Sequence, residues 1–298
     1  MDCMPFLYRA LYQALCAVGR PFGGVRPRSL YDVLGRRAFP RAEYAWSRNR
    51  WGAELLLSPH FHIDRNILNF GCYDENLHLA IERLVQPGMV CFDVGANLGE
   101  MTLHMAARAG ANGAVYAFDP VPAVFQRLQQ HIERNTAKNA HAFELALSNQ
   151  NGKCNISAGD ANADNQGLAS IVNPDHAAAS ATIEIETQTL DDFVKAHAIS
   201  RIDVMKIDIQ GAESFLLEGG RGVFAAAQAP DLFMEISPDD LKGAGKNSRE
   251  LCAAIEDFGY SIFELNRGSI GRKIPASDVR PDFHATNVFC SKRHGLAG

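Results

Sequence analysis

From about residue 75 onward, short apolar segments alternate with longer amphipathic ones, and this rhythm constrains the fold more than any other feature. Segments 89–94, 114–119 and 203–208 are short, apolar and bounded by turn residues, which is typical of buried strands. Segments with helical spacing, such as 98–109 and 123–134, follow the first two. A strand followed by a helix and another strand predicts parallel strands joined by crossovers.

The full pattern predicts an α/β fold with a seven-stranded, mostly parallel sheet and helices on both faces. The last two strands follow each other without an intervening helix, which indicates an antiparallel hairpin at one edge. The predicted strands are 89–94, 114–119, 141–147, 203–208, 231–236, 260–265 and 287–290. The predicted helices are 77–85, 98–109, 123–134, 190–197, 214–227 and 248–258. Doubly wound enzymes of several kinds share such a layout, so the fold alone does not settle the function.

Residues 148–181 interrupt the rhythm with a segment rich in Asn, Ala, Ser, Asp and Gly. We interpret it as a long loop that contains a short strand near 154–157, and an exposed strand at 183–187 follows it. Long loops inside compact domains are usually functional or disordered. We therefore expect this loop to contribute to the walls of a ligand site.

The first 70 residues form a separate, basic extension ahead of a domain at 71–298. Nine Arg stand against three acidic residues in the first 50 positions, whereas the whole chain carries a net charge of −5. The apolar spacing at 5–18 predicts an amphipathic helix. That helix could dock on the domain, mediate self-association or lie on a membrane surface. The arginines either pair with the acidic domain or face an anionic neighbour.

Composition excludes several classes of protein. The seven cysteines are scattered, without a CxxC pair or the Cys/His spacing of a zinc site. No apolar run reaches the roughly 20 residues of a membrane-spanning helix. The acidic domain argues against binding to nucleic acid, which needs a basic surface. We expect a cytoplasmic protein.

The segment from Asp93 to Gly99 reads Asp-Val-Gly-Ala-Asn-Leu-Gly and joins a predicted strand to a predicted helix. Gly95 permits a tight turn, and Gly99 lets the helix pack near the strand. A dinucleotide site prefers G-x-G-x-x-G, which is absent here. An acidic residue two positions before the first glycine repels a pyrophosphate but suits the amino group and sulfonium of S-adenosylmethionine (SAM). The alternative interpretation is a strand–helix turn that binds no ligand.

Asp119 ends the next strand and is followed by Pro120. A carboxylate at that place can accept both hydroxyl groups of a ribose. It could also be an ordinary turn residue. Because the two motifs end neighbouring strands, where ligands bind in such sheets, together they favour a SAM site more than either does alone.

A third motif, Lys-Ile-Asp-Ile-Gln-Gly-Ala-Glu, runs from Lys206 to Glu213. Strand alternation points Lys206 and Asp208 to the same face, and Asp208 lies at the strand's carboxyl end. Glu213 stands near the start of the next helix, where a negative charge is stabilising on its own account. We therefore consider Lys206, Asp208 and Glu213 as catalytic candidates.

These motifs, with Ala-Phe-Asp-Pro at 117–120, Ala-Leu-Ser at 146–148, Gly-Leu-Ala-Ser at 167–170 and Thr-Leu-Asp-Asp at 189–192, resemble the FkbM family of SAM-dependent methyltransferases. The resemblance runs from about residue 73 to 238. It implies the class I methyltransferase Rossmann-like fold and O-methylation of sugars, glycoconjugates or polyketide hydroxyls, mostly in bacteria. Asp119 replaces the more usual Glu, and Gln210 stands where Glu is usual.

The resemblance and the motifs together give a predicted cofactor site at the carboxyl ends of the strands. Its predicted residues are Glu75, Asp93, Gly95, Ala96, Asn97, Gly99, Thr102, Asp119, Pro120, Ala146 and Leu147.

Glu235 ends another apolar strand, where a lone buried carboxylate would be costly and calls for a partner. A hydroxyl acceptor needs its proton removed or its oxygen polarised. Asp208 could be the general base. Alternatively, Asp208 and Glu235 could bind Mg²⁺ through their oxygens.

Two other classes of function remain open beside O-methylation of a small-molecule or saccharide acceptor. An NAD(P)-linked Rossmann enzyme is disfavoured by the missing glycine pattern. A non-catalytic SAM-binding or scaffold protein is disfavoured by the presence of Asp208.

Overall fold

The computed structural model describes residues 10–12, 14, 34–35, 37–39, 42–157 and 182–293. These residues fall into two compact units, one that ends at Glu75 and one that begins at Asn76. Most of the predicted helix at 5–18 and the segment 167–170 lie outside the described residues. None of the helices within them has both the length and the apolar character needed to span a bilayer.

The first unit contains an antiparallel hairpin and a helix. Strands β1 (Ala45–Arg48) and β2 (Glu54–Leu57) form the hairpin, and α3 (His62–Phe70) follows. The turn between the strands forms because the Asn49 side chain accepts hydrogen bonds from the backbone of Trp51 and Ala53.

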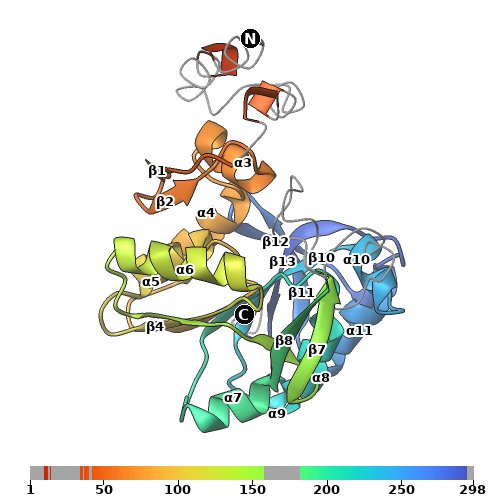
Figure 1. Cartoon of the computed structure of the whole chain (residues 1–298). Helices are drawn as coiled ribbons and strands as arrows, with labels where there is room; N and C mark the ends of the chain where they lie inside the picture. The colour runs from red at the N-terminus through yellow and green to blue at the C-terminus, as the bar shows by residue number, and fades with distance from the viewer. Residues whose placement is uncertain are drawn as a thin grey trace. The chain divides into compact units, whose positions relative to one another are not determined.

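The second unit is built on one large sheet (Figure 1). Its strand order is β12-β11-β13-β10-β9-β3-β4-β5. Its middle and one edge are parallel, and the other edge is antiparallel. The parallel strands are β3 (Val90–Val94), β4 (Ala114–Phe118), β5 (Ala140–Phe143), β9 (Val204–Ile207) and β10 (Asp231–Ile236). The antiparallel additions are β13 (Ala285–Ser291), β11 (Ser261–Asn266) and β12 (Ser269–Lys273). The predicted α/β class I methyltransferase fold is confirmed, with β12 as an eighth strand beyond the predicted hairpin.

Helices cover both faces of this sheet, as predicted. Cys91 and Phe92, neighbours in β3, point to opposite faces and belong to different clusters of buried apolar side chains. The Cys91 face carries α4 (Glu75–Leu84), α5 (Glu100–Ala109) and α6 (Pro122–Arg134). The Phe92 face carries α7 (Leu190–Ala196), α8 (Glu213–Gly219), α9 (Arg221–Ala225), α10 (Pro238–Gly243) and α11 (Ser248–Asp257).

Two sequence-based boundaries are wrong. The predicted strand 141–147 is two strands, because after Phe143 the chain leaves the large sheet and Ala146–Ser148 (β6) pairs with β8 (Thr182–Thr189). Together with β7 (Gly152–Ser157), these strands form a three-stranded sheet that contains the predicted strands 154–157 and 183–187. The predicted helix 214–227 is interrupted at Gly220, where a Cβ would lie 2.6 Å from the Phe224 ring.

The strand order creates a switch point at the centre of the sheet. From β3 the chain moves outward through β4 to β5, and it then returns to place β9 on the other side of β3. The loops that follow β3 and β9 therefore leave neighbouring strands at the same edge of the sheet, and their chains continue in opposite directions along it. Ligands of doubly wound sheets bind in such a crevice.

Gly95 allows these two loops to approach each other. Its φ is +78°, and a Cβ at this position would lie 1.9 Å from the backbone oxygen of Asp208. Any larger residue at position 95 must push the two loops apart, because the two nearest atoms, the carbonyl oxygen and carbon of Asp208, belong to the backbone.

We expect Gly95→Ala to lower the free energy of unfolding by about 2–4 kcal/mol, because left-handed strain adds to a backbone clash. Gly245→Ala is the matched control: its φ is +66° at the left-handed end of α10, but a Cβ there would meet nothing within 4 Å. The control should cost only about 1 kcal/mol. Urea unfolding measures both, and equal losses would contradict the clash.

Candidate functional site

The loop after β3 is fastened to the end of β4. The backbone N–H groups of Gly95 and Ala96 both donate to the carbonyl of Phe118, at 3.0 and 2.9 Å. Asn97 takes a left-handed backbone conformation, with φ +50°, which its own side chain supports by accepting from the Leu98 N–H at 2.7 Å. Gly99 also has a positive φ, and a Cβ there would lie 2.4 Å from Leu128 of α6. These contacts fix the start of α5.

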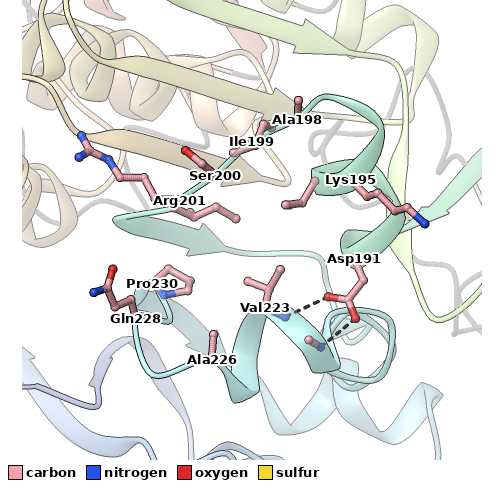
Figure 2. Close-up of a pocket in the computed structure, with 13 residues that line it drawn as sticks. Asp191, Lys195, Ala198, Ile199, Ser200, Arg201, Val223, Ala226, Gln228 and Pro230 are labelled. Carbon is pink, nitrogen blue, oxygen red and sulfur yellow. Dashed lines mark hydrogen bonds between the residues drawn. The ribbon is translucent and has the colours of Figure 1, made fainter.

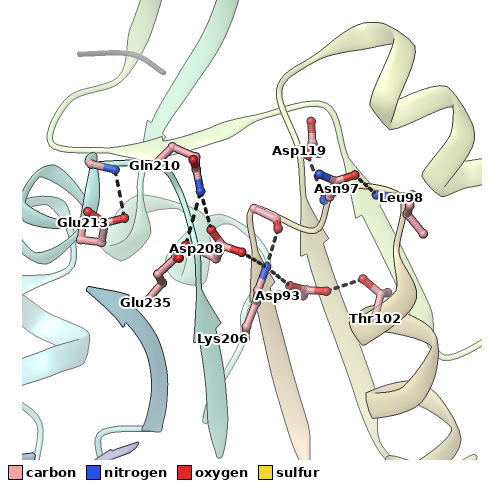
Figure 3. A network of polar contacts seen from close by, with 12 residues as sticks. Asp93, Asn97, Leu98, Thr102, Asp119, Lys206, Asp208, Gln210, Glu213 and Glu235 are labelled. Carbon is pink, nitrogen blue, oxygen red and sulfur yellow. Dashed lines mark hydrogen bonds and ion pairs between the residues drawn. The ribbon is translucent and has the colours of Figure 1, made fainter. Parts of the chain in front are cut away.

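Asp119 is connected directly to this loop. Its Oδ2 accepts from the Asn97 N–H at 2.9 Å (Figure 3). Its Oδ1 accepts from the Val121 N–H at 3.0 Å. Burial raises the pKa of Asp119 to about 6, against the lowering effect of these two hydrogen bonds. Each carboxylate oxygen can accept a further hydrogen bond, so the group retains the capacity to bind two hydroxyls.

Asp93 is fully buried behind the loop. Its Oδ2 accepts from the Thr102 hydroxyl at 2.6 Å, and its Oδ1 lies 3.3 Å from the Lys206 ammonium. Lys206 also donates to the Gly95 carbonyl at 2.5 Å and lies 3.6 Å from Asp208 Oδ2. Burial would lower the pKa of Lys206, but the charges of Asp93 and Asp208 outweigh it and raise that pKa. Asp93, Thr102 and Lys206 thus link the loop after β3 to the end of β9.

Asp208 faces outward at the end of β9, with 34% of its side chain exposed. Gln210 Nε2 donates to Asp208 Oδ1 at 3.0 Å and to Glu235 Oε2 at 3.4 Å (Figure 3). The pairing of β10 with β13 is irregular between Met234 and Ile236, at Glu235 itself. Such bulges redirect side chains, and this one lies beside the cluster.

The two acids of this cluster differ in protonation. Burial raises the pKa of Glu235 to about 9, helped by the charge of Asp208. Burial would also raise the pKa of Asp208, but the Lys206 ammonium and hydrogen bonds with Glu235 and Gln210 keep it below its ordinary value. At neutral pH the pair is therefore one carboxylic acid, Glu235, beside one carboxylate, Asp208.

Glu213 is buried and turned toward its own loop. Its Oε1 accepts from the Gly211 N–H at 3.2 Å. Burial raises its pKa to about 7, and hydrogen bonds from the backbone of Glu213, Gly211 and Ile209 oppose that rise. These contacts make Glu213 a support for the Asp208 loop, and none of them reaches the other predicted site residues.

The remaining predicted residues have other contacts in the structure. Glu75 belongs to the first unit, where it forms an ion pair with Arg50. Ala146 and Leu147 are buried in β6, and their backbones pair with β8. Pro120 directly follows Asp119 and begins the connection to α6.

A cavity of about 490 Å³ lies between α7 and α9 (Figure 2). It is lined by residues that precede β9 and β10, such as Ile202 and Pro230, so it lies at the opposite edge of the sheet. Its Asp191 carboxylate accepts from the Gly222 and Val223 N–H groups and stabilises the start of α9. None of the predicted site residues lines it.

Comparison with known proteins connects the carboxyl-edge site to a family. A family profile, the methyltransferase FkbM domain, matches residues 93–262, which is more than half of the chain and includes all three motifs. The chain belongs to the FkbM methyltransferase family. This membership decides for a SAM-dependent methyltransferase over the dinucleotide alternative.

Individual proteins resemble this FkbM methyltransferase at low sequence identity. It is 28% identical over 172 residues to the 2-O-methyltransferase NoeI of Sinorhizobium fredii, covering 54% of this chain and 68% of that protein. It is 24% identical to Methyltransferase 1 of Beauveria bassiana, covering 43% of this chain and 56% of that protein. Aeropyrum pernix fibrillarin, solved with natively bound SAM, aligns with 84% of this chain and all of its own at 11% identity and a TM-score of 0.41. The fold assignment rests on the sheet topology above.

The residues at the carboxyl edge fit SAM as the cofactor of the FkbM methyltransferase. Asp119 is a buried acceptor at the end of β4, and the loop 95–99 contacts it through a hydrogen bond from the Asn97 N–H. A carboxylate at this position suits the two hydroxyl groups of a ribose.

The same residues do not fit Mg²⁺, which the sequence offered as an alternative. Among the residues that the structure describes, no three His, Cys, Asp or Glu side chains are grouped to hold a metal ion. The Gln210 amide donates into the gap between Asp208 and Glu235, and the Lys206 ammonium lies 3.6 Å from Asp208. The places that a cation would take are therefore held by hydrogen-bond donors.

We expect Lys206→Met to lower the free energy of unfolding by about 3 kcal/mol, the low end of the range for a broken buried pair, because Asp208 stays partly hydrated. Lys153, which pairs with Glu184 and Glu186 on the surface, gives the matched control Lys153→Met. The control should change little, since exposed ion pairs contribute little. Guanidinium unfolding compares the two, and a Lys206→Met protein as stable as the control would contradict this account.

Proposed function

We propose that this FkbM methyltransferase transfers the methyl group of SAM to a hydroxyl oxygen of a saccharide, a glycoconjugate or a polyketide-type small molecule. The observation that carries this proposal is the Asp208 carboxylate, which is held ionised and partly exposed beside the cofactor loop. The name of the Sinorhizobium relative, a 2-O-methyltransferase, supports oxygen as the atom that is methylated.

Two sets of residues divide the work in this proposal. When bound, SAM supplies an electrophilic methyl group on a positively charged sulfur. Asp119 accepts hydrogen bonds from the ribose hydroxyls, and the rigid loop 95–99 fixes the cofactor's position. Methyl transfer is an in-line displacement that depends mainly on alignment, so the firm attachment of the loop to Phe118 and Lys206 serves the reaction directly.

Asp208 is the general base for the acceptor hydroxyl. Bound SAM would supply the methyl group that bonds to the acceptor oxygen and would keep the electron pair of the broken bond on sulfur, and the Asp208 carboxylate would take the hydroxyl proton. Glu235, protonated at neutral pH, and Gln210 both donate to Asp208 and orient it. The lowered pKa keeps Asp208 ionised across the neutral range, and only the ionised carboxylate can act as a base.

The charge of the chain favours a small or saccharide acceptor over a nucleic acid. The chain carries −5 overall although nine arginines lie in its first 50 residues, so the methyltransferase domain is strongly acidic. A polyanionic acceptor would be repelled by such a domain.

We expect Asp119→Ala to weaken SAM binding roughly 10- to 100-fold, because hydrogen bonds to a charged acceptor are lost. Isothermal titration with SAM measures the effect, and NAD serves as the negative control for the cofactor. A well-folded wild-type protein that does not bind SAM would refute the assigned site.

SAM affinity of the wild type should also fall as the pH decreases through about 6. The folded-state pKa of Asp119 is raised to about 6, so this group becomes protonated there and loses acceptor capacity, whereas an ordinary Asp stays ionised down to about 4. Repeating the titration between pH 5 and pH 8 tests this. A flat profile over that range would show that Asp119 does not bind the cofactor in its ionised form.

Asp208→Asn should reduce the turnover number roughly 10²- to 10⁴-fold, the usual contribution of a general base, and leave SAM affinity nearly unchanged. Asp282→Asn, at an exposed position paired with Arg280, is the matched control and should retain full activity. Turnover is followed by transfer of labelled methyl groups to a panel of sugars. A variant that binds SAM normally and keeps its turnover would eliminate Asp208 as the base.

A further inference from the structure

Gln210 orients Asp208 in the proposed reaction, and it also contacts Glu235, an acid on the neighbouring strand. One nitrogen atom, Nε2, lies 3.0 Å from Asp208 Oδ1 and 3.4 Å from Glu235 Oε2 (Figure 3). A primary amide carries two N–H hydrogens, so this nitrogen can donate one to each acid. The amide therefore joins the ends of β9 and β10 through their carboxyl groups.

The backbone presets the position of this amide. Gln210 has a left-handed conformation with φ +53°, which costs a non-glycine residue about 1 kcal/mol or more. Gly211 follows with φ +97°, and a Cβ there would lie 2.4 Å from the carbonyl oxygen of Asp240. Because the turn is packed against α10, the amide is directed to the two acids by the fold and not by a free choice of rotamer.

We infer that Gln210 is a positioning residue that joins Asp208 and Glu235 without a bound cation, so that the acceptor site works free of metal. This inference rests on the proposed function, because it concerns the base of that reaction. The amide and Lys206 supply the hydrogen-bond donors and the positive charge that a divalent ion would otherwise bring to the two acids.

Replacing the amide by a carboxylate should reverse this arrangement. In Gln210→Glu an oxygen takes the place of Nε2, and three carboxyl groups then converge with oxygens about 3 Å apart, a separation that suits the ligand shell of Mg²⁺ or Ca²⁺. Three acids this close cannot all ionise without a counter-ion. The variant should therefore be destabilised without a divalent cation and recover when one binds.

The test is thermal unfolding of the full chain in millimolar Mg²⁺, in Ca²⁺ and in EDTA. We expect the wild type to melt at the same temperature in all three, and Gln210→Glu to melt several degrees higher with a cation than in EDTA, as binding to the folded state requires. Gln129→Glu, the same change on the exposed surface of α6, is the control and should not respond to cations. A cation-insensitive Gln210→Glu, or a wild type that is stabilised equally, would overturn the inference.

A second variant covers the case in which Gln210→Glu does not fold. The swap Gln210→Glu with Glu235→Gln restores two acids and one amide in the same space, so it should be soluble and insensitive to cations. Insolubility of the swap, or a cation response in it, would count against the inference. Neither measurement uses SAM or an acceptor, so a failure of the proposed O-methylation, seen with Asp208→Asn, is distinguishable from a failure here.

Discussion

The candidate site depends on one buried ammonium group. Lys206 is almost inaccessible to water, and its charge is compensated by Asp93, Asp208 and the carbonyl of Gly95. These partners come from β3, from the loop after β3 and from the end of β9 itself. Because a buried charge without a partner is costly, the two loops cannot separate without losing this compensation. The ammonium thus keeps the loop after β3 and Asp208, the proposed general base, at a constant spacing.

The same requirement explains why acidic residues at the carboxyl edge have different tasks. Asp93 faces inward and neutralises Lys206, and Glu213 accepts hydrogen bonds from the backbone of its own loop. Asp119 and Asp208 lie where each can still accept a hydrogen bond from a ligand, Asp119 at the end of β4 and Asp208 with a third of its side chain exposed. Acids that support the site and acids that meet ligands are therefore distinguished by burial and by the partners they already have.

Sequence reasoning located the strand ends but not the partners of the side chains there. Asp119 and Asp208 could be predicted because each directly follows an apolar strand, and parallel strands end at one edge. The direct role expected for Asp93 with the cofactor could not be judged, because its burial by Lys206 depends on β9 lying next to β3, a neighbour set by topology and not by local pattern. The break after Phe143 was missed for a similar reason: the partner of β6 is β8, which lies about forty residues further along the chain. In the sequence, Gln210 could be recognised only as a position where a carboxylate is usual. Its position between Asp208 and Glu235 could not be predicted, because it depends on the bulge at Glu235.

The difference between Asp208 and Glu235 completes the chemical logic of the site. Both acids end strands at the switch edge, but the Lys206 ammonium lies 3.6 Å from Asp208, where its charge lowers the pKa of Asp208, whereas burial raises the pKa of Glu235 to about 9. An acid–carboxylate pair has one group that accepts a proton and one that donates a hydrogen bond to it, and the Gln210 amide holds the two in register. A second ammonium, or a metal ion in place of the amide, would ionise both acids and remove this difference. The asymmetry of charge around two similar acids, more than the presence of either one, is what makes Asp208 the proposed base.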